Sequence, residues 1–525
     1  MPVRNILFIM ADQLRADCWG AGLTGAQALP GAKLETPNLE ALARRGTVFT
    51  RAYCPAAICG PSRMAFYTGQ FASTHGSTVN TAPLQVGTRT LGDRLRDRGV
   101  RVGLAGKTHM RADTVGMARL GLSDISDQGV LAAECGFEPF ARDDGLHPLK
   151  KAADKGYNAY LRGLGYAADN PWHDFANSAL GPDGDILSGW YLRNADKAAR
   201  IPAEHSETAW TTDRAIDFIT DAGDTPWCLH VSYIKPHWPY IAPEPYCGSV
   251  GPDAVWAAAP VPENPHPVHR AFMDHGECVG FRESGARERV IPTYLALIRE
   301  VDTHVGRLMA FLKDRNLDGE TLVVFTSDHG DYLGDHGLGE KQLFHDPSAR
   351  IPMIISHPDL HSDAPIDRPV NGVDLLPTFL EALGADPDEP LDLDGRSLMP
   401  LLRGEDPSPG RFEETVCELD YATRTARRAL GIDPARARGW MVRAGRWKYI
   451  HWLDLPPQLY DLEDDPAEGT DRAADPTCAA TLRDMKDRLT DHLLRRLTRC
   501  SFTRSEVESE TDDYYFGGRI KMGVW

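Results

Sequence analysis

The sequence predicts an α/β protein with a large, mixed but mostly parallel sheet flanked by helices, followed by a small α+β domain with an antiparallel sheet. Short apolar runs alternate with helical patterns over roughly the first 400 residues, which is typical of parallel strands buried between helices. Beyond that point the chain has short strands joined by a tight turn and then one amphipathic helix. The expected domains are residues 1–400, residues 401–500 and a C-terminal arm at 501–525.

The expected strands of the α/β part are continuous apolar runs bounded by glycine or polar residues, at 5–10, 100–105, 227–233, 321–326 and 351–356. The expected helices alternate with them, at 36–46, 90–98, 206–222, 294–312 and 374–383. The helix at 294–312 is the clearest, because its apolar residues form one stripe at helical spacing. Thr36 is expected to cap the first helix, with Pro37 in its first turn and Gly46 at its end.

Two long segments interrupt this alternation. Residues 111–205 have little periodicity and are rich in Gly, Asp and Ala, so we expect an insertion over the active face of the sheet. Residues 241–290 contain many prolines and are expected to form a long loop region. In the small domain we expect strands at 415–419, 440–443 and 447–452, a hairpin turn at Ala444–Gly445 and a helix at 480–497.

The charge balance and the cysteines exclude several classes of protein. With 57 basic and 75 acidic residues the net charge is −18, which disfavours nucleic acid and anionic lipid surfaces as partners. No apolar run is long enough to span a membrane, and the short run at 6–10 leads directly to Asp12, so we expect a cytoplasmic protein without a signal peptide. The ten cysteines include no Cys-x-x-Cys pair, so neither a zinc ribbon nor a disulfide framework is indicated.

Polar side chains follow several of the predicted strands. Because the carboxyl ends of parallel strands share one edge of a sheet, these groups are expected to meet there. Each alone has an ordinary structural explanation, as a helix cap or a hydrogen-bonded histidine. Together, two carboxylates, an amide oxygen and an imidazole can bind one divalent cation. The groups are Asp12-Gln13, Lys107 with His109, His237, and Asp328-His329.

A specific motif occupies residues 59–69, which read Cys-Gly-Pro-Ser-Arg-Met-Ala-Phe-Tyr-Thr-Gly. This run matches the sulfatase signature Cys-x-Pro-Ser-Arg followed by Thr-Gly. Further matches are Thr36–Leu39, Gly106-Lys107-x-His109, Pro236-His237-x-Pro239, Ser327–Gly330, Lys341, Asp374–Thr378, and 445–450 with 458–466 in the small domain. Over nearly its whole length the chain therefore resembles a type I sulfatase of the alkaline phosphatase superfamily, which implies an alkaline phosphatase-like fold.

The resemblance implies a particular nucleophile. In that family the cysteine is oxidised to formylglycine by a formylglycine-generating enzyme, which would act here on Cys59. One hydroxyl of the hydrated aldehyde attacks sulfur or phosphorus and displaces the alcohol, and the second then expels the anion. The implied metal ligands are Asp12, Gln13, Cys59, Asp328 and His329. The implied catalytic residues are Arg63 and Lys107 on the aldehyde hydrate, His109 as the base, and His237 and Lys341 near the leaving oxygen.

The chain departs from the commonest sulfatase pattern at the metal site. Many sulfatases have Asp-Asp and Asp-Asn where this chain has Asp12-Gln13 and Asp328-His329. The latter pairs are similar to those of bacterial phosphonate monoester hydrolases and choline sulfatases. Asn80 also resembles the phosphonate-hydrolase branch, and either holds a substrate oxygen or makes a structural hydrogen bond. Because His329 offers nitrogen and calcium prefers oxygen, manganese is favoured over calcium as the single divalent ion.

Lys107 and His109 match sulfatases and stand where phosphonate hydrolases have Tyr and Thr. The expected activity is therefore hydrolysis of small sulfate monoesters, as in arylsulfatases. The alternative is a phosphonate monoester or phosphodiester hydrolase with the same machinery, and a further one is a sulfatase-like binding protein whose cysteine stays unmodified. The tail has an acidic stretch at 505–513 and then aromatic residues. We expect it to dock on a neighbouring subunit of a homo-oligomer, a tetramer or a dimer.

Overall fold

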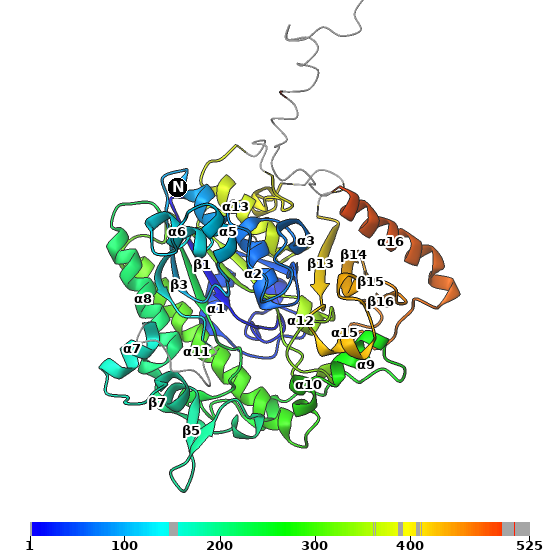
Figure 1. Ribbon diagram of the computed structural model, residues 1–525, viewed down its shortest axis with the longest axis horizontal. Coiled ribbons are helices and arrows are strands. Elements are labelled where there is room, and N and C mark those ends of the chain that lie inside the picture. Colours follow the sequence, from blue (N-terminus) through cyan, green and yellow to red (C-terminus); the bar gives the residue numbers. More distant parts are fainter. Residues whose placement is uncertain are drawn as a thin grey trace, which may run out of the picture.

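A central sheet of eight strands forms the middle of the molecule in the computed structural model (Figure 1). The structure describes residues 3–145, 156–360, 362, 364–386, 392–405, 410, 412–495 and 509. In spatial order the strands are β12 (Ile366–Asn371), β2 (Thr47–Tyr53), β11 (Met353–Ser356), β10 (Thr321–Ser327), β1 (Asn5–Ala11), β8 (Trp227–Tyr233), β3 (Arg101–Gly106) and β4 (Glu138–Arg142). Strand β11 runs antiparallel to both of its neighbours, and the other pairs are parallel.

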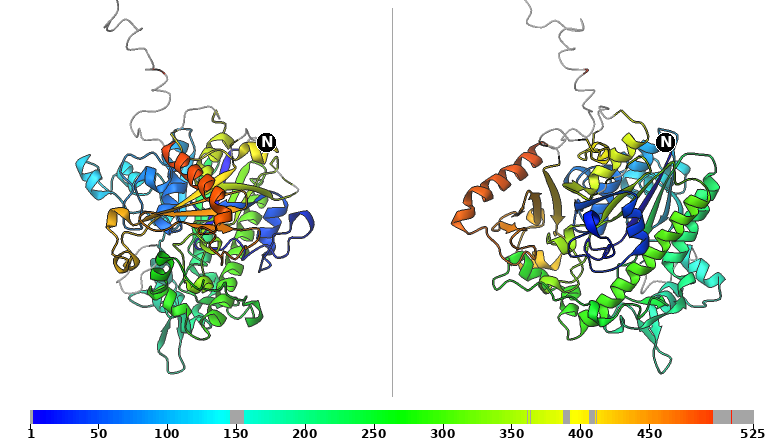
Figure 2. Two further views of the ribbon diagram at one scale, coloured as in Figure 1. Left: turned by 90° about the vertical axis from the view of Figure 1, so that its right-hand side faces the viewer. Right: turned by 180° about the vertical axis from the view of Figure 1, so that it is seen from behind.

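Both faces of this sheet are buried, which explains the unbroken apolar runs of its strands. Along β1, Ile6 and Phe8 face one core cluster, whereas Leu7 and Ile9 face the other. Helices α2 (Cys59–Thr68), α4 (Leu91–Arg96) and α13 (Leu375–Ala382) contribute to the first cluster. Helices α1 (Pro37–Arg44), α8 (Glu207–Ala222) and α11 (Ala286–Asp314) contribute to the second, and α11 crosses the back of the sheet in Figure 2.

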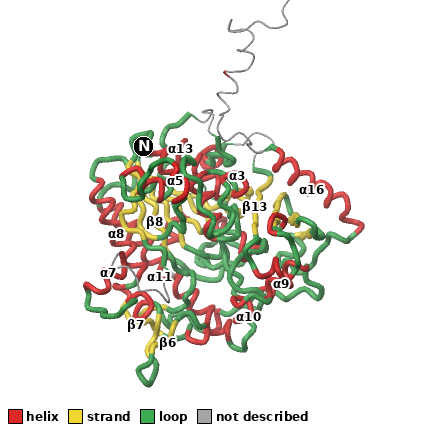
Figure 3. Tube along the Cα trace, in the orientation of Figure 1, coloured by secondary structure: helices red, strands yellow, loops and turns green. Residues whose placement is uncertain are grey.

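A separate antiparallel sheet follows, with strands β13 (Glu414–Asp420), β14 (Arg438–Ala444), β15 (Trp447–Trp452) and β16 (Gln458–Asp461). Helix α16 (Ala479–Leu494) lies beside this sheet (Figure 3). Its Met485 and Leu489 share a core cluster with Val416, Val442 and Leu459 of the strands. The predicted fold class is confirmed, while the domain limits at residues 400 and 500 stay predictions. Ala444 pairs with Trp447, so the hairpin turn is Gly445–Arg446, one residue later than predicted.

The two interrupting segments contain more structure than the sequence indicated. The loop prediction for 241–290 is wrong in part, because α9 (Pro267–Met273) and α10 (Gly276–Phe281) lie there and α11 already begins at Ala286. Pro267 starts α9 at a position where a missing N–H costs nothing. The segment at 111–205 supplies β4 to the main sheet.

The remaining elements are short. The helices are α3 (Ala72–His75), α5 (Thr114–Arg119), α6 (Asp127–Ala133), α7 (Gly156–Gly163), α12 (Asp346–Ala349), α14 (Met399–Leu402) and α15 (Thr425–Ala429). The strands are β5 (Ser178–Leu180), β6 (Ile186–Ser188), β7 (Ala198–Pro202) and β9 (Ala242–Glu244). None of the helices in the described part of the chain has the length and apolar character needed to cross a lipid bilayer. The nine cysteines within the described residues are all free thiols.

Helix α1 is capped from a distant part of the chain. Its first N–H groups donate to the carboxylate of Asp302 on α11, with 2.7 Å between Leu39 N and Oδ1 and 3.3 Å between Asn38 N and Oδ2. Thr36 occupies the predicted N-cap position, but its hydroxyl oxygen accepts a hydrogen bond from Gly20 N and makes none with the helix. The helix start is therefore stabilised by tertiary structure.

Candidate active site

The structure brings a cysteine, two carboxylates and an imidazole to the carboxyl edge of the sheet. Asp12 directly follows β1, Asp328 and His329 follow β10, and Cys59 begins α2. One ligand atom from each of these four lies within 4.8 Å of the others, and all four residues are buried. The structure thus brings Asp12, Asp328 and His329, which the strand-end pattern placed at one edge of the sheet, together with Cys59 of the motif.

Cys59 lies among positively charged groups. Its Sγ is 3.0 Å from His329 Nε2. Burial by itself raises the pKa of this thiol, but the charges of Lys341, His329 and Lys107 and a hydrogen bond with His109 outweigh it and hold the pKa well below its usual range. A side chain at this position is therefore stabilised in its anionic form.

Arg63 holds the two carboxylates. Its Nε donates to Asp328 Oδ2 at 2.8 Å and its Nη2 to Asp12 Oδ2 at 3.0 Å, while Nη1 donates to Ser232 Oγ and to the Lys107 carbonyl. Lys107 Nζ adds an ion pair at 2.6 Å from Asp12 Oδ2. Burial raises the pKa of Asp12, but these cations, Lys107 foremost, bring it well below its usual value. Asp12 is therefore kept ionised, and the hydrogen bonds fix the direction of both carboxylates.

The donor set fits a divalent cation. Asp12 Oδ1 is buried and has no hydrogen-bond partner among the described residues, an arrangement that is costly unless a cation satisfies it. His329 Nδ1 lies 2.9 Å from the Gly330 carbonyl oxygen, to which it donates its proton, so Nε2 is the atom that faces the cluster and is free to bind a cation once it is deprotonated. Gln13 differs, because its Oε1 accepts a hydrogen bond from Lys341 at 2.6 Å, and its part in ligation stays a prediction.

Lys341 and His237 form a pair beside this cluster. Lys341 Nζ lies 2.9 Å from His237 Nε2, and His237 Nδ1 lies 2.6 Å from the Trp238 carbonyl oxygen. Burial and the neighbouring Lys341 charge lower the pKa of His237 to about 3. The pKa of Lys341 is raised, because the anionic groups of Cys59 and Glu340 outweigh its burial. Lys341 therefore carries the proton of this pair at neutral pH.

His109 is fixed by a carboxylate that sequence reasoning missed. Its backbone has a φ of 55°, and Asp144 Oδ1 accepts hydrogen bonds from the N–H groups of Thr108 and His109 at 2.9 and 3.0 Å. Arg142 in turn holds Asp144 Oδ2. The His109 Nδ1 atom is buried without a hydrogen-bond partner among the described residues, as expected of a group that serves a ligand. Asp144 follows β4, and missing that strand hid its role.

The side-chain oxygen of Asn80 makes a structural hydrogen bond, one of the two roles expected for this residue. Asn80 Oδ1 accepts a hydrogen bond from Gly60 N at 2.9 Å in the first turn of α2. A Cβ atom at position 60 would meet that oxygen at 2.9 Å, so glycine allows this close contact. Another residue that the sequence did not single out is Asp331, which accepts hydrogen bonds from Gln13 Nε2 at 2.5 Å and from Tyr240 OH at 2.5 Å. The sequence feature that could have pointed to Asp331 is its position three residues after Asp328.

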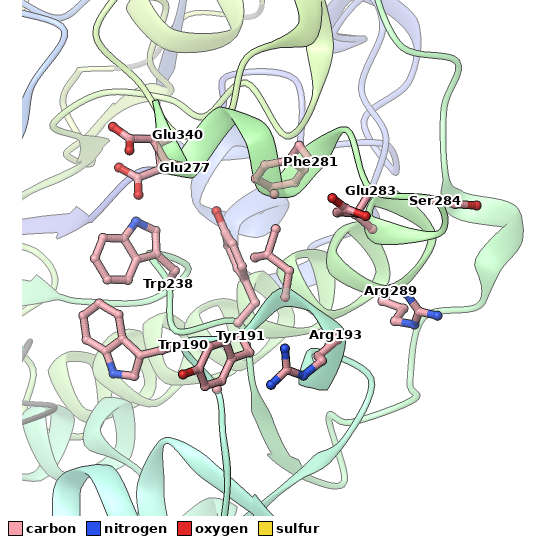
Figure 4. A pocket seen from close by; sticks show the side chains of 16 residues that line it. Trp190, Tyr191, Arg193, Trp238, Glu277, Phe281, Glu283, Ser284, Arg289 and Glu340 are labelled. Carbon is pink, nitrogen blue, oxygen red and sulfur yellow. The ribbon is translucent and has the colours of Figure 1, made fainter. Parts of the chain in front are cut away.

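A pocket of about 740 Å³, whose lining side chains Figure 4 draws, lies against chain neighbours of the Lys341–His237 pair. Trp238 and Glu340, the chain neighbours of His237 and Lys341, belong to its wall, as does Tyr240. The segment at 189–193 and helix α10 supply much of the rest. Both interrupting segments thus contribute to the wall of this pocket.

Comparison with known proteins agrees with this geometry. The family model described as Sulfatase matches residues 4–385, and the model described as N-sulphoglucosamine sulphohydrolase, C-terminal, matches residues 334–495. The chain is 30% identical over 516 residues to the multifunctional alkaline phosphatase superfamily protein PehA of Trinickia caryophylli, covering 92% of this chain and 94% of that protein. It is 30% identical over 480 residues to the choline-sulfatase of Rhizobium meliloti (strain 1021), covering 90% and 83%.

Among solved structures, the phosphonate monoester hydrolase SpPMH from Silicibacter pomeroyi superimposes with a TM-score of 0.81 at 28% identity, covering 95% of this chain and 98% of that one. The phosphonate monoester hydrolase of Agrobacterium radiobacter gives a TM-score of 0.76 at 27% identity, covering 95% and 96%. These matches run nearly end to end, and the family model spans the whole central sheet. The chain therefore belongs to the sulfatase family of the alkaline phosphatase superfamily.

Proposed function

We propose that this protein hydrolyses sulfate monoesters with a formylglycine made from Cys59 and one divalent ion bound by Asp12, Cys59, Asp328 and His329. The observation that carries the proposal is the four-residue cluster within 4.8 Å together with the unpartnered buried Oδ1 of Asp12. Such an ion, when bound, lowers the pKa of an oxygen nucleophile and supplies positive charge to an anionic ester. The Sulfatase family match supports the same reaction.

The chain's own residues have distinct tasks in this proposal. Arg63 directs the carboxylates toward the ion rather than touching substrate, since its hydrogen bonds are made with Asp12, Asp328, Ser232 and the Lys107 carbonyl. Lys107 adds positive charge beside the nucleophile. His109, held by Asp144, removes a proton at position 59 when the product anion leaves.

Lys341 serves the other end of the ester. Its raised pKa leaves a proton on Nζ, which is aimed at His237 and Gln13 and can shift to the oxygen of the departing alcohol. His237 stays neutral and orients that ammonium through Nε2. Asn80, whose oxygen is bound to Gly60 N, is proposed to offer its amide N–H₂ to a substrate oxygen.

A second candidate is hydrolysis of phosphonate monoesters or phosphodiesters, which the Asp328-His329 pair and the likeness to two phosphonate monoester hydrolases favour. Initial rates on an aryl sulfate, an alkyl sulfate, a phenyl phosphonate ester and a phosphodiester decide between them. The mass of the peptide containing residue 59 reports how much protein carries formylglycine. We expect aryl sulfate to have the highest kcat/KM. A much faster phenyl phosphonate reaction would reverse the order, and fully modified protein without any turnover would favour a binding role.

The finer features belong to the same proposal. They are manganese rather than calcium as the ion, a formylglycine-generating enzyme as maturation partner, a cytoplasmic location, and a homo-oligomer of four or two chains. The arm at 501–525, on which the oligomer prediction depends, lies outside the described residues apart from Ser509. Light scattering at micromolar concentration measures the oligomeric state, and a monomer contradicts that part.

A further inference from the structure

The loop that carries Lys341 is held in a strained backbone conformation. Four residues of this loop (333–342) other than glycine have a positive φ: Leu333 at 50°, His336 at 58°, Glu340 at 55° and Gln342 at 105°. Positive φ is uncommon for such residues, because the side chain then crowds its own backbone. Glu340 and Gln342 lie on either side of Lys341, so the strain adjoins the ammonium group of the proposed site. Strain of this kind persists only where the surrounding structure holds the chain.

Three buried histidines, His269, His336 and His345, form a cluster (the histidine cluster) that closes this loop. His336 lies within the loop and His345 just beyond it, and their rings stack with centroids 4.2 Å apart and an interplanar angle of 20°. His269 of α9 donates from Nε2 to the His336 carbonyl oxygen at 2.9 Å, and its ring centroid lies 5.5 Å from that of His345. The stack therefore brings together residues on either side of Lys341.

Each ring of the histidine cluster has one nitrogen without a hydrogen-bond partner among the described residues. These atoms are Nδ1 of His269, Nδ1 of His336 and Nε2 of His345, and all three side chains are buried. A neutral imidazole has one N–H group, whereas a protonated imidazole has an N–H group at both nitrogens and needs two acceptors. Protonation of any of these rings would therefore leave a charged donor buried without an acceptor, which is costly.

The charged groups around the histidine cluster do not favour its protonation. The titratable and charged neighbours are Arg15, Arg270, Asp335, Lys448 with its ion-pair partners Asp346 and Glu468, and the phenols of Tyr332 and Tyr460. The carboxylate that faces His336 is Asp335, which already pairs with Arg15 at 2.8 Å and with Arg287 at 3.4 Å. Its negative charge is therefore largely matched before any ring takes up a proton.

The rings of the histidine cluster are neutral at pH 7. Burial is the largest effect on each of them. It lowers the pKa of His269 and, together with repulsion between the rings, lowers that of His336 to about 4 and that of His345 well below its usual range. In an opened loop the same rings would take up protons near pH 6.5. The closed loop therefore loses stability as the pH falls from about 6.5 to about 4, and regains it when the pH is raised again.

We propose that the histidine cluster is an acid-sensitive clamp, which holds the Lys341 loop closed while its rings are neutral and releases it when they are protonated. On protonation the stacked rings repel each other and separate, and the strained residues Glu340 and Gln342 relax. Lys341 then leaves its position 2.9 Å from His237. The catalytic consequence rests on the proposed function, in which Lys341 serves the departing alcohol, and the three histidines are positioning residues in it.

The first test measures amide hydrogen exchange of the wild-type protein at pH 7 and pH 5 by mass spectrometry. Protection factors are compared, because they remove the effect of pH on exchange from the unfolded chain. In the closed loop the amides of Gly334 and His336 donate hydrogen bonds to the carbonyl oxygens of Leu338 and Ala259, so the peptide that contains them reports opening. We expect its protection to fall at least about tenfold at pH 5, as linkage predicts for one histidine, and to return at pH 7.

Strand β1 distinguishes opening of the loop from opening of the whole protein. Because β1 lies in the middle of the central sheet, we expect its amides to stay better protected than those of the loop at both pH values. Unchanged protection of the loop at pH 5, a loss that does not reverse at pH 7, or equal protection of the loop and β1 would overturn the inference.

The variant His336→Phe assigns the effect to the histidine cluster. It keeps a ring for the stack on His345 but binds no proton, so the acid-induced loss of loop protection should be at least about fivefold smaller than in the wild type. The matched control is His304→Phe, because His304 is a buried histidine of α11 outside the cluster, and burial lowers its pKa to about 3. This control should respond as the wild type does.

A second variant covers the case in which His336→Phe does not fold. His269→Gln also removes a site of protonation, while its amide N–H₂ can still donate to the His336 carbonyl oxygen, and it should again reduce the acid response. A wild-type response in a folded cluster variant would overturn the inference. Failure of the proposed function looks different, because protein carrying formylglycine would then hydrolyse no sulfate ester at pH 7, while the loop would still open in acid.

Discussion

Lys341 Nζ and His237 Nε2 lie 2.9 Å apart, and the two side chains differ in charge because their pKa values are shifted in opposite directions. A neutral imidazole beside an ammonium orients the ammonium proton without competing for it. In the proposed reaction this pair would stabilise negative charge on the leaving oxygen, most of all when that oxygen is a poor leaving group.

Replacing Lys341 should therefore have a cost that depends on the alcohol. For Lys341→Ala we expect kcat/KM for an alkyl sulfate to fall by about 10²- to 10⁴-fold, and for 4-nitrophenyl sulfate, whose phenolate leaves unaided, by much less. Steady-state kinetics over a series of phenyl sulfates of graded phenol pKa measure this effect. The plot of log kcat/KM against phenol pKa should be steeper for the variant than for the wild type. Equal losses for all esters would show that Lys341 acts elsewhere.

Cys59→Ala should abolish turnover while preserving the fold. We expect kcat to fall by about 10⁵-fold or more, the scale seen when a catalytic nucleophile is removed. Sulfate release measures the activity, and near-ultraviolet circular dichroism checks the packing. Cys247→Ala, a half-buried cysteine in the segment at 241–290, is the matched control and should retain activity. A well-folded Cys59→Ala protein with wild-type rates would contradict the proposed nucleophile.

His109→Ala should separate release of the alcohol from release of sulfate. Because the base is missing only from the second half of the reaction, we expect one equivalent of alcohol in a burst, followed by a stall. Rapid-mixing absorbance with an aryl sulfate gives the burst amplitude, and intact-protein mass should increase by the retained sulfate. If the variant releases alcohol more slowly and shows no burst, His109 acts in the first half of the reaction, before the alcohol leaves.

Removal of the metal should stop the reaction and expose the preference for manganese. After chelation and dialysis we expect activity to be lost and to return further with Mn²⁺ than with Ca²⁺, because His329 supplies nitrogen to the site. Elemental analysis of protein purified without added metal gives an independent reading. Calcium alone in the protein, with full activity, would refute the preference while leaving the site in place.

His230 should make the fold sensitive to acid. Burial, with the nearby Arg63 charge, lowers its pKa to about 3, and its ring stacks on Phe8 with centroids 4.4 Å apart. An unfolded histidine takes up a proton near pH 6.5, whereas this one does not until about pH 3, so its contribution to stability decreases as the pH falls through that interval.

The variant His230→Phe isolates this contribution. Between pH 7 and pH 5 we expect the free energy of unfolding of the wild type to fall by about 2 kcal/mol relative to that of the variant. Urea unfolding at the two pH values measures the difference. Parallel changes in both proteins would mean that the pKa of His230 in the folded state is close to its value in the unfolded chain.

The sequence was most informative where one strand meets one polar side chain. Asp12 after β1 and Asp328 after β10 were predicted together because an apolar run followed by a carboxylate is a local pattern. Strands β2 and β12 were missed, because Arg51 interrupts the apolar pattern of β2 and Asp367 and Pro369 interrupt that of β12, the edge strand.

The residues that hold the predicted site residues and helix ends in place could not be predicted from local patterns. Asp144 holds His109 and Asp302 caps α1 only because tertiary structure brings distant segments together. The same holds for Arg63: the motif predicted its presence, but its contacts with both carboxylates depend on how α2 lies across the ends of β1 and β10. Hydrogen-bond partners of this kind have no periodicity that a single sequence can reveal.

The position of β1 has a consequence for the order of events during synthesis. This strand is synthesised before β8 and β10, yet it pairs with both of them, so that Asn5 has Thr321 as its neighbour. Once these strands are together, Cys59 is only 1% exposed at the start of α2. An enzyme that oxidises Cys59 must therefore reach it before the sheet closes. The fraction of active protein would then depend on the rate of Cys59 oxidation relative to the rate of folding. Slower translation or delayed folding should therefore raise that fraction.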